Sequence, residues 1–556
     1  MLADGRTVPA DETIQTEVCV VGAGPAGIAI AKELSRARVE VVLLERGPDP
    51  RVEPPRNADT AINIGIPYRV GRSRMFAVGG ATHRWHIPTA MGDGYGRVRE
   101  LDEEDFESRP WIPNSGWPIR KDQLDTFYQR ARSLFDLPVT PAIEESSKPN
   151  PFAVDETIET RIFSFANPGV FAGEMRRDLE NSPHALLLSN STVTEIKTDT
   201  VTGTVSSLKV GTSSRHSYTV QARYYVLAGG GIENPRLLLA SRSSIPNGVA
   251  NRHDLVGRFF MEHPHYSSGY LIPGHADTFT DTRSHAIYLH GGVPLQRKYG
   301  LTEDVIKAHG LNRIVFYLSA EPLTVKLDAV RYSESAIRSL EASRGLYQAI
   351  RGRRWSPDDV GDLFTTVRGA HHVLRHITRR LITEVHKRRR DDRYTRPYLF
   401  WIRAMAEQVP NAASRVRLDE SRDELGVPLA ALEWRLTDQD IASMRTTQEL
   451  FGEAQVSAGH RKVASFLEGR ERPAFLTGGN HHMGTTRMAA SPRQGVVDAD
   501  CRVHDHDNLF VAGSSVFPTG GYANPTLTLL ALAFRLSDHI ADRLRRPAGI
   551  DSPTPN

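Results

Sequence analysis

Three glycines near the start of the chain have the spacing that binds the phosphates of a dinucleotide. Gly22, Gly24 and Gly27 form a G-x-G-x-x-G pattern, and Glu45 follows 18 residues after Gly27. Gly22 permits a tight turn, Gly24 lets the backbone approach a pyrophosphate, and Gly27 lets a helix pack closely on a strand. The Glu45 carboxylate can accept hydrogen bonds from ribose hydroxyls. The pattern predicts a dinucleotide site, and its N-terminal position and E-R-G ending favour FAD over NAD.

A strand, a turn and a helix must hold these glycines in place. Residues 18–21 are a short apolar run typical of a buried strand, and residues 26–34 continue with helical periodicity. Residues 39–44 form a second strand-like run that ends at Glu45. The N-terminus of the helix then presents its free N–H groups to the phosphates.

A second helix start lies in GGYANPTLTLLALAF, which begins at Gly520. Asn followed by Pro often starts a helix, because Asn524 can accept from the free N–H groups and Pro525 has no N–H to satisfy. The positive end of the helix dipole then lies beside Asn524. These residues alone leave open whether Asn524 is only a cap or is aimed at a ligand.

Composition sets limits on the kind of protein. The 556 residues suffice for two or three domains, and 39% hydrophobic and 24% charged residues are typical of a globular protein. A net charge of +3 implies no nucleic-acid partner. Cys19 and Cys501 lack metal-ligand spacing, so no metal site is expected. No signal peptide is visible and no apolar stretch reaches the length of a membrane span, which together predict a cytoplasmic protein. A homo-oligomer stays open.

Patterning along the chain suggests separate regions. Residues 266–330 alternate apolar and polar positions as sheet strands do, whereas 333–392 are helix-like with a basic end. A basic helix could touch a membrane surface or an acidic partner, but a solvated helical insertion is the favoured interpretation. We expect the tail, 547–556, to be disordered.

Several motifs in order resemble the glucose–methanol–choline (GMC) oxidoreductase family. They include the glycine pattern, the Gly79-Gly80 turn, VLAGGGIENPRLLL, VGRFFMEHP, EQVPNAASRVRL and HHMGTTRM…NLFVAGSSVFPTGGYANPTLTLLALA. The string GYANPTLT looks like the branch of pyranose oxidases, glycoside 3-oxidases and sugar dehydrogenase flavoprotein subunits.

The resemblance implies a fold of the α/β plus α+β class. It combines a Rossmann-like FAD-binding domain with a discontinuous substrate domain built on an antiparallel sheet with helices. The corresponding ranges are 12–90, 185–265 and 470–546 for the first, and 91–184 and 266–469 for the second.

Two catalytic positions follow from the resemblance. The family places a histidine three residues before a Gly-Thr, which here is His481, as the base that takes the hydroxyl proton while a hydride passes to flavin N5. The second position is His or Asn, and here it is Asn524, which would hold the substrate oxygen by hydrogen bonding. His482 is expected to point elsewhere.

The resemblance also assigns binding residues. The positions expected to contact FAD are Gly22, Gly24, Ala26, Gly27, Glu45, Arg46, Gly79, Gly80, Thr82, His83, Val193, Gly229, Gly513, Ser514, Asn524, Pro525 and Thr526. Where some relatives carry a covalently linked histidine, this chain has Arg84, which favours non-covalent FAD. Candidates for contacts with a sugar are Arg84, Trp85, Gln408, Asn411 and Tyr522.

The expected activity is oxidation of a secondary ring hydroxyl of a pyranose or glycoside to a ketone, with the 3-position slightly favoured. Oxygen or another acceptor would reoxidise the flavin. Two alternatives stay open at this point. One is a flavoprotein subunit of a sugar or polyol dehydrogenase that uses a quinone or cytochrome acceptor, and the other is a lyase that keeps FAD without redox use.

Overall fold

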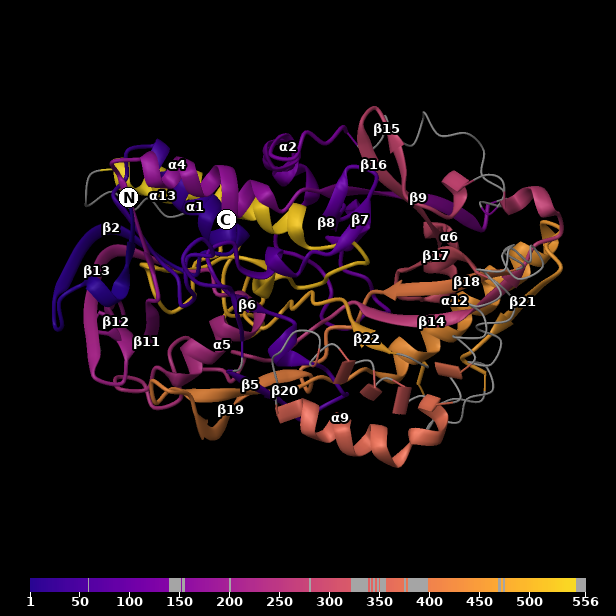
Figure 1. The fold of residues 1–556 in the computed structure, drawn as a ribbon. Helices are drawn as coiled ribbons and strands as arrows, with labels where there is room; N and C mark the ends of the chain where they lie inside the picture. Colours follow the sequence, from indigo (N-terminus) through magenta and orange to yellow (C-terminus); the bar gives the residue numbers. More distant parts are fainter. Residues whose placement is uncertain are drawn as a thin grey trace.

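The protein is built around two large sheets, as the computed structural model shows (Figure 1). The structure describes residues 1–58, 60–139, 152, 156–199, 202–279, 282–321, 399–468, 472–473 and 476–546, with parts of 339–378. The predicted fold class is confirmed, because a parallel-core sheet with helices stands beside a larger antiparallel sheet.

The first sheet has eight strands in the order β1-β10-β3-β2-β13-β12-β11, with β23 beside β13. Its strands are β1 (Leu2–Asp4), β2 (Thr13–Val21), β3 (Val41–Leu44), β10 (Ala185–Ser189), β11 (Thr192–Thr198), β12 (Val205–Ser213), β13 (His216–Leu227) and β23 (Leu509–Val511). The central pairs of β2 with β3 and β13 are parallel.

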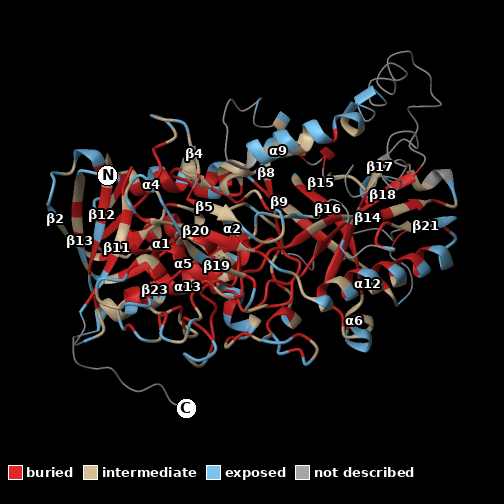
Figure 2. Ribbon diagram, turned by 90° about the horizontal axis from the view of Figure 1, so that it is seen from below, coloured by how far each residue is buried: buried red, intermediate tan, exposed pale blue. Residues whose placement is uncertain are grey.

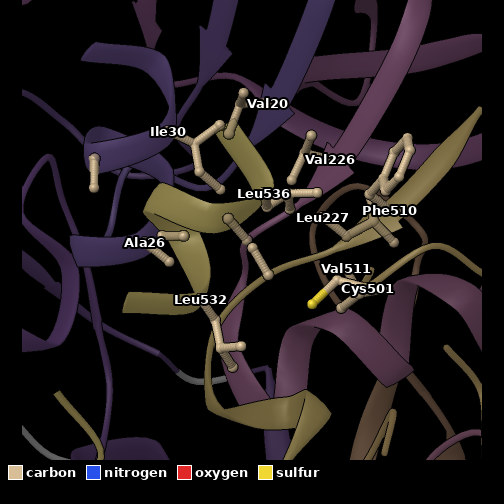
Figure 3. Close-up of a cluster of buried hydrophobic side chains, with 14 of the residues drawn as sticks. Val20, Ala26, Ile30, Val226, Leu227, Cys501, Phe510, Val511, Leu532 and Leu536 are labelled. Atoms are coloured by element: carbon tan, nitrogen blue, oxygen red, sulfur yellow. The ribbon is translucent and has the colours of Figure 1, made fainter. Parts of the chain in front are cut away.

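The predicted strand–turn–helix unit lies at the centre of this sheet. β2 leads through the glycine turn into α1 (Pro25–Arg36), and the chain returns along β3. The apolar side of α1 packs against α13 (Thr526–Arg545), so Ala26 and Ile30 share a buried cluster with Leu532 and Leu536 (Figure 3). The two ends of the chain therefore build one core.

The second sheet has ten strands in the order β21-β14-β18-β17-β16-β9-β8-β7, with β15 beside β16 and β22 beside β14. Its strands are β7 (Ile87–Thr89), β8 (Gly92–Val98), β9 (Ile158–Ala166), β14 (Pro264–Ile272), β15 (Tyr288–His290), β16 (Val293–Leu301), β17 (Ile314–Glu321), β18 (Leu399–Ala406), β21 (Lys462–Ser465) and β22 (Thr477–Gly478). All of the strand pairs in the described part of this sheet are antiparallel.

The two faces of this sheet have different surroundings. One face buries apolar residues such as Phe316 and Ile402 in a cluster that includes Met444 and Phe451 of α12 (Asp438–Ser457). Residues opposite each other in an antiparallel pair share a face. The register pairs of the strands therefore put five side chains together on the other face, which we call the site face: Arg97, Phe163, His265, Lys298 and Met405.

Smaller elements complete the described chain. A three-stranded sheet joins β5 (Ala61–Asn63) to β19 (Arg415–Arg422) and β20 (Pro428–Glu433), and β4 (Arg56–Asn57) pairs with β6 (Met75–Phe76). The remaining described α-helices are α2 (Asp125–Ser133), α4 (Arg176–Asn181), α5 (Gly230–Ala240), α6 (Glu303–His309) and α9 (Pro357–Arg368).

The predicted helical insertion, 333–392, is only partly described. Within it α9 lies on the outside of the molecule and exposes apolar side chains, among them Phe364 at 74% (Figure 2). The basic end of the insertion and the tail 547–556 lie outside the described residues. No helix in the described part of the chain is long and apolar enough to cross a membrane.

The chain passes between the two large sheets several times. Strands β1 to β3 belong to the first sheet, β7 to β9 to the second, β10 to β13 to the first, β14 to β18 to the second, and β23 to the first. β1 adds residues 2–4 to the first sheet, and β19 and β20 pack on α5 rather than joining the ten strands. The exact domain ranges stay a prediction.

Gly27→Ala is expected to destabilise the fold. A Cβ at residue 27 would lie 1.9 Å from the carbonyl oxygen of Gly22. Overpacking of this kind costs roughly 1–3 kcal/mol, which should lower the melting temperature of the nucleotide-free protein. Gly24→Ala is the matched control, because a Cβ there would meet no atom within 4 Å. Equal melting temperatures for the two variants would contradict a close contact between helix and turn at Gly27.

Candidate active site

The glycine turn after β2 leaves room for a ligand at the N-terminus of α1. Gly22 has a φ of +103°, and a Cβ there would come within 2.8 Å of the backbone of Ala228. An added Cβ at Gly24, by contrast, would meet open space. The first turn of α1 has no side-chain cap, so its N–H groups stay available to phosphate oxygens.

The Gly79-Gly80 turn lies against this loop, although it is more than fifty residues away in the sequence. The N–H of Gly79 donates to the carbonyl of Ala23 over 2.8 Å, and a Cβ on Gly80 would lie 2.9 Å from Cα of Gly24. Thr82 donates its hydroxyl to the carbonyl of Gly79 over 2.8 Å, which closes the short helix Gly80–Arg84. The two glycine turns therefore form one continuous surface.

Glu45 lies at the carboxyl end of β3, beside the glycine loop that follows β2. Its carboxylate accepts from the N–H of Ala23 over 2.8 Å and from the N–H of Gly47 over 2.7 Å. Burial raises the pKa of Glu45 to about 7. Arg46 is paired with Asp423 at 3.1 Å, so its charge is already neutralised by a protein group.

The other predicted cofactor positions are spread around the same end of the first sheet. Val193 is buried in β11, and Gly229 donates its N–H to the side chain of Asn234 at the start of α5. Gly513 has a φ of +96° with open space around an added Cβ, and the hydroxyl of Ser514 donates to the carbonyl of His482 over 2.7 Å.

These residues fit FAD. The Cβ positions of Gly24 and Gly513 are open, a helix N-terminus is uncapped, and a buried carboxylate marks the end of β3. Open backbone at a helix N-terminus suits a pyrophosphate, and the carboxylate suits a ribose.

The two residues predicted to be catalytic meet. Nε2 of His481 lies 2.9 Å from Nδ2 of Asn524. The side chain of Asn524 is 7% exposed, and its Oδ1 is buried without a hydrogen-bond partner among the described protein atoms. A small polar group placed beside them could reach both side chains.

Asn524 does not cap the helix that follows it. α13 begins at Thr526, its N-cap position is Pro525, and no side chain of the described chain caps it. Of the two roles left open for Asn524, the structure therefore does not show the cap: its Oδ1, the atom that would accept from the first turn, has no partner among the described atoms, and its amide N–H is directed to His481.

A chain of hydrogen bonds continues behind His481. Its Nδ1 lies 2.9 Å from Nδ1 of His263, whose Nε2 lies 3.3 Å from the carbonyl of Gly520. Since Asn524 donates to Nε2 of His481, the proton of that ring lies on Nδ1 and is donated to His263. His263 then donates its Nε2–H to Gly520. Every ring nitrogen in this chain has a partner, and neither ring carries a charge.

The pKa values agree with neutral rings. Burial, followed by the neighbouring His263 and His265, holds the pKa of His481 well below its usual value. Burial lowers the pKa of His263 to about 4. A neutral imidazole whose Nε2 can accept a proton is what a general base needs at pH 7.

The carboxylate of Glu262 holds the backbone on both sides of the base. It is fully buried and accepts from the N–H groups of His263, Gly479 and His481, each over 2.9 Å. The hydroxyl of Tyr68 also donates to it, over 2.5 Å. Burial raises the pKa of Glu262 to about 7.

His482 points away from His481, as expected. Its Nε2 lies 2.8 Å from the hydroxyl of Tyr68, and its ring packs beside Phe260. Burial lowers its pKa to about 3.

The predicted sugar contacts are differently placed. Gln408 is 2% exposed and uses its amide within the protein, since Oε1 accepts from the indole of Trp434 over 2.9 Å and Nε2 donates to the carbonyl of Arg435 over 3.0 Å. Asn411 accepts from the N–H of Ala413 over 2.9 Å in a turn. The arrangement of these two amides lends no support to a role in binding sugar.

The remaining candidates also have protein partners. Arg84 donates to the side chain of Asn57, and the ring of Trp85 packs edge-on against Phe171. Tyr522 donates its hydroxyl to Asp102 over 2.5 Å. Their roles toward a substrate stay predictions.

Sequence reasoning missed Glu262, His263 and His265, which surround the base. The signal was the string M-E-H-P-H, in which three titratable residues lie within four positions at the start of β14. Among the described residues no group of three or more His, Cys, Asp or Glu side chains could hold a metal ion.

Comparisons with known proteins agree with this arrangement. Residues 17–246 match the family model described as FAD dependent oxidoreductase, and residues 410–533 match the model described as GMC oxidoreductase. The solved structure of a formate oxidase variant from Aspergillus oryzae has a TM-score of 0.50 and 14% identity, covering 96% of this chain and 99% of that one.

Two curated relatives are similar over part of their length. The fructose dehydrogenase large subunit of Gluconobacter japonicus is 24% identical over 65% of this chain and 55% of the relative. A C-glycoside 3-oxidase of Microbacterium trichothecenolyticum is 34% identical over 24% of this chain and 25% of the relative. The chain thus matches about half of the first relative and a quarter of the second. The glycine loop lies in the part that matches the FAD dependent oxidoreductase model, and His481 and Asn524 lie in the part that matches the GMC oxidoreductase model, so the chain belongs to the GMC oxidoreductase family.

Proposed function

We propose that this protein oxidises a secondary ring hydroxyl of a pyranose or glycoside to a ketone, with the 3-position slightly favoured. The observation that carries the proposal is the 2.9 Å contact between Nε2 of His481 and Nδ2 of Asn524. Two such atoms can both hydrogen-bond one hydroxyl oxygen, because an oxygen about 2.8 Å from each completes a nearly equilateral triangle. The sugar is supported by similarity to a C-glycoside 3-oxidase and to a fructose dehydrogenase subunit.

Each residue of the pair has its own task. The substrate hydroxyl donates to Nε2 of His481 and accepts from the amide N–H of Asn524, which replaces the hydrogen bond between the two side chains. His481 then takes the proton, and its Nδ1–H remains bonded to His263. Asn524 keeps its N–H on the oxygen as negative charge develops there. FAD, when bound, supplies the two-electron acceptor for the hydrogen that leaves the carbon.

We also propose that FAD is held without a covalent bond. The position of the covalent histidine in some relatives is Arg84, which donates to Asn57. The nearby His83 uses Nε2 to donate to the carbonyl of Val78 over 2.9 Å, and His86 bonds the carbonyl of Arg84 over 2.8 Å. One ring nitrogen of each histidine is thus taken up by a backbone carbonyl, which supports non-covalent binding.

The electron acceptor is oxygen or, in the alternative, a quinone or cytochrome. Similarity to a dehydrogenase large subunit supports the alternative, and comparing reoxidation by oxygen and by a quinone separates the two. A non-redox lyase would show no anaerobic bleaching of the flavin by sugar.

His481→Ala should abolish most turnover while keeping the cofactor. Loss of a general base lowers rates by about 10²- to 10⁴-fold. The measurement is anaerobic bleaching of the flavin by a panel of glycosides, with FAD content determined from the flavin released on heat denaturation.

His482→Gln is the matched control, because the ring of His482 points to Tyr68 and should change the rate by less than about tenfold. Full activity in His481→Ala would remove His481 from the mechanism. Flavin that stays on the denatured chain would refute non-covalent binding.

Asn524→Ala should slow flavin reduction by about 10²- to 10³-fold, the usual loss for one donor to a developing oxyanion. The melting temperature should change little, since the side chain caps no helix. Asn524→His restores a donor and should recover part of the rate. A large loss of melting temperature with normal turnover would leave Asn524 a structural role only.

The rate of flavin reduction should not fall between pH 8 and pH 5.5. A base with a lowered pKa stays deprotonated at lower pH, so kcat/KM should vary by less than about twofold between pH 8 and pH 5.5, whereas a histidine of pKa about 6.5 would lose about tenfold. The pKa of Glu262, about 7, falls within the same pH range. The same pH profile is therefore measured in Glu262→Gln, which removes the titration of Glu262. A fall below pH 6.5 that persists in Glu262→Gln would contradict a lowered pKa at His481.

A further inference from the structure

Two basic side chains lie on the site face without a carboxylate beside them. Lys298 projects from β16 and Arg97 from β8, and no ion pair joins either to an acidic residue in the described part of the chain. Other arginines around this sheet are paired: Arg99 lies 2.9 Å from Asp102, and Arg313 lies 2.9 Å from Asp105. The lack of a neighbouring carboxylate is therefore a feature of Lys298 and Arg97 and not of every basic side chain around this sheet.

Lys298 is enclosed by apolar groups. It is 0% exposed, and its Nζ lies 3.8 Å from the centre of the Phe163 ring and 3.8 Å from the sulfur of Met405. An ammonium group buried in this way loses its hydration, and one aromatic face replaces only a part of it. Burial accordingly lowers the pKa of Lys298 well below its usual value. An anion beside Nζ would restore the charge and its solvation.

Arg97 lies on the same face, between rings of neighbouring strands. Its guanidinium is 5.8 Å from the centre of Phe165 and 5.5 Å from that of Tyr317, and its Nε is buried without a partner among the described residues. Tyr317 also lies 5.4 Å from Nζ of Lys298, so both basic groups lie beside the same ring.

These cations are close to the proposed base. The positive charges of Lys298 and Arg97 both contribute to lowering the pKa of His265, after its burial, and Arg97 contributes at His481. The ring of His265 lies 6.2 Å from that of His481, and its Nε2 is buried without a hydrogen-bond partner among the described residues. The ring of Phe163, under Lys298, is 6.1 Å from Tyr522, two residues before Asn524. The site face therefore leads from the pair His481 and Asn524 to the two cations.

We propose that the substrate is an anionic sugar or related alcohol, whose carboxylate binds Lys298 and Arg97 while its hydroxyl lies at His481 and Asn524. This inference rests on the proposed function and names its substrate class. A carboxylate fits because it can take one hydrogen bond from an ammonium and another from a guanidinium. A phosphate or sulfate ester shares this chemistry, and the test distinguishes it.

The test compares substrates that differ only in charge. Anaerobic flavin reduction of the holoenzyme is measured with a methyl glucuronide, its neutral methyl ester, the corresponding methyl glucoside and a glucose phosphate. We expect kcat/KM for the acid to exceed that for the ester by about 10- to 100-fold, the range for charge-assisted hydrogen bonds. A phosphate that reduces the flavin faster than the acid would assign the anionic group to a phosphate ester.

Lys298→Met should remove this preference. It is expected to lower kcat/KM for the acid by about 10- to 100-fold and to leave the ester unchanged within about twofold. Its melting temperature should rise, because a buried amino group without a polar partner destabilises the fold. Lys462→Met on β21 is the matched control, since Lys462 is exposed on the same sheet and should affect neither substrate.

Equal rates for acid and ester, or an unchanged acid rate in Lys298→Met, would overturn the inference. Failure of every sugar to bleach the flavin would instead contradict the proposed function. In that case calorimetric titration with glucuronate still tests the anion site. We expect glucuronate to bind the wild type with proton uptake and to bind both Lys298→Met and Lys298→Gln more weakly. Equal binding of glucuronate by the wild type and these variants would again overturn the inference.

Discussion

The buried carboxylate of Glu262 is the group on which the geometry of the site depends. It binds the N–H groups of three residues from two distant stretches, 262–265 and 479–482, and so fixes His481 relative to His263. A carboxylate with no exposure is costly unless its oxygens are fully hydrogen-bonded, and here four donors reach it. Each donor that is lost would leave charge unsatisfied, which makes this junction resistant to small distortions.

The two sheets divide the work of the enzyme. The first sheet places the glycine turn and the N-terminus of α1 at the carboxyl ends of its parallel strands, where phosphate groups bind in folds of this kind. The second sheet uses one face for packing against α12, and on the other it carries His265, Lys298 and Arg97 beside apolar side chains. His481 follows β22 of the second sheet and Asn524 follows β23 of the first, so each sheet leads to one residue of the pair.

Local sequence rules predicted the parts that depend on local geometry. The turn at Gly22, helix α1 and β3 follow from glycine spacing and apolar periodicity, and the structure has them within a few residues. The rules failed where a distant partner decides. Asn524 looked like a cap but bonds His481, and Gln408 looked free to bind sugar but bonds Trp434. The hydrogen bond between the rings of His263 and His481 joins residues 218 positions apart, which no local pattern reveals.

The repeated passage of the chain between the sheets has a consequence for how the protein folds. The first sheet receives its strand β23, and the core of α1 receives α13, only after the second sheet has been synthesised. A fragment that ends near residue 246 would expose the face of α1 that α13 covers. The first sheet therefore gains its complete core only when the C-terminal segment has returned to it, after most of the chain has been made.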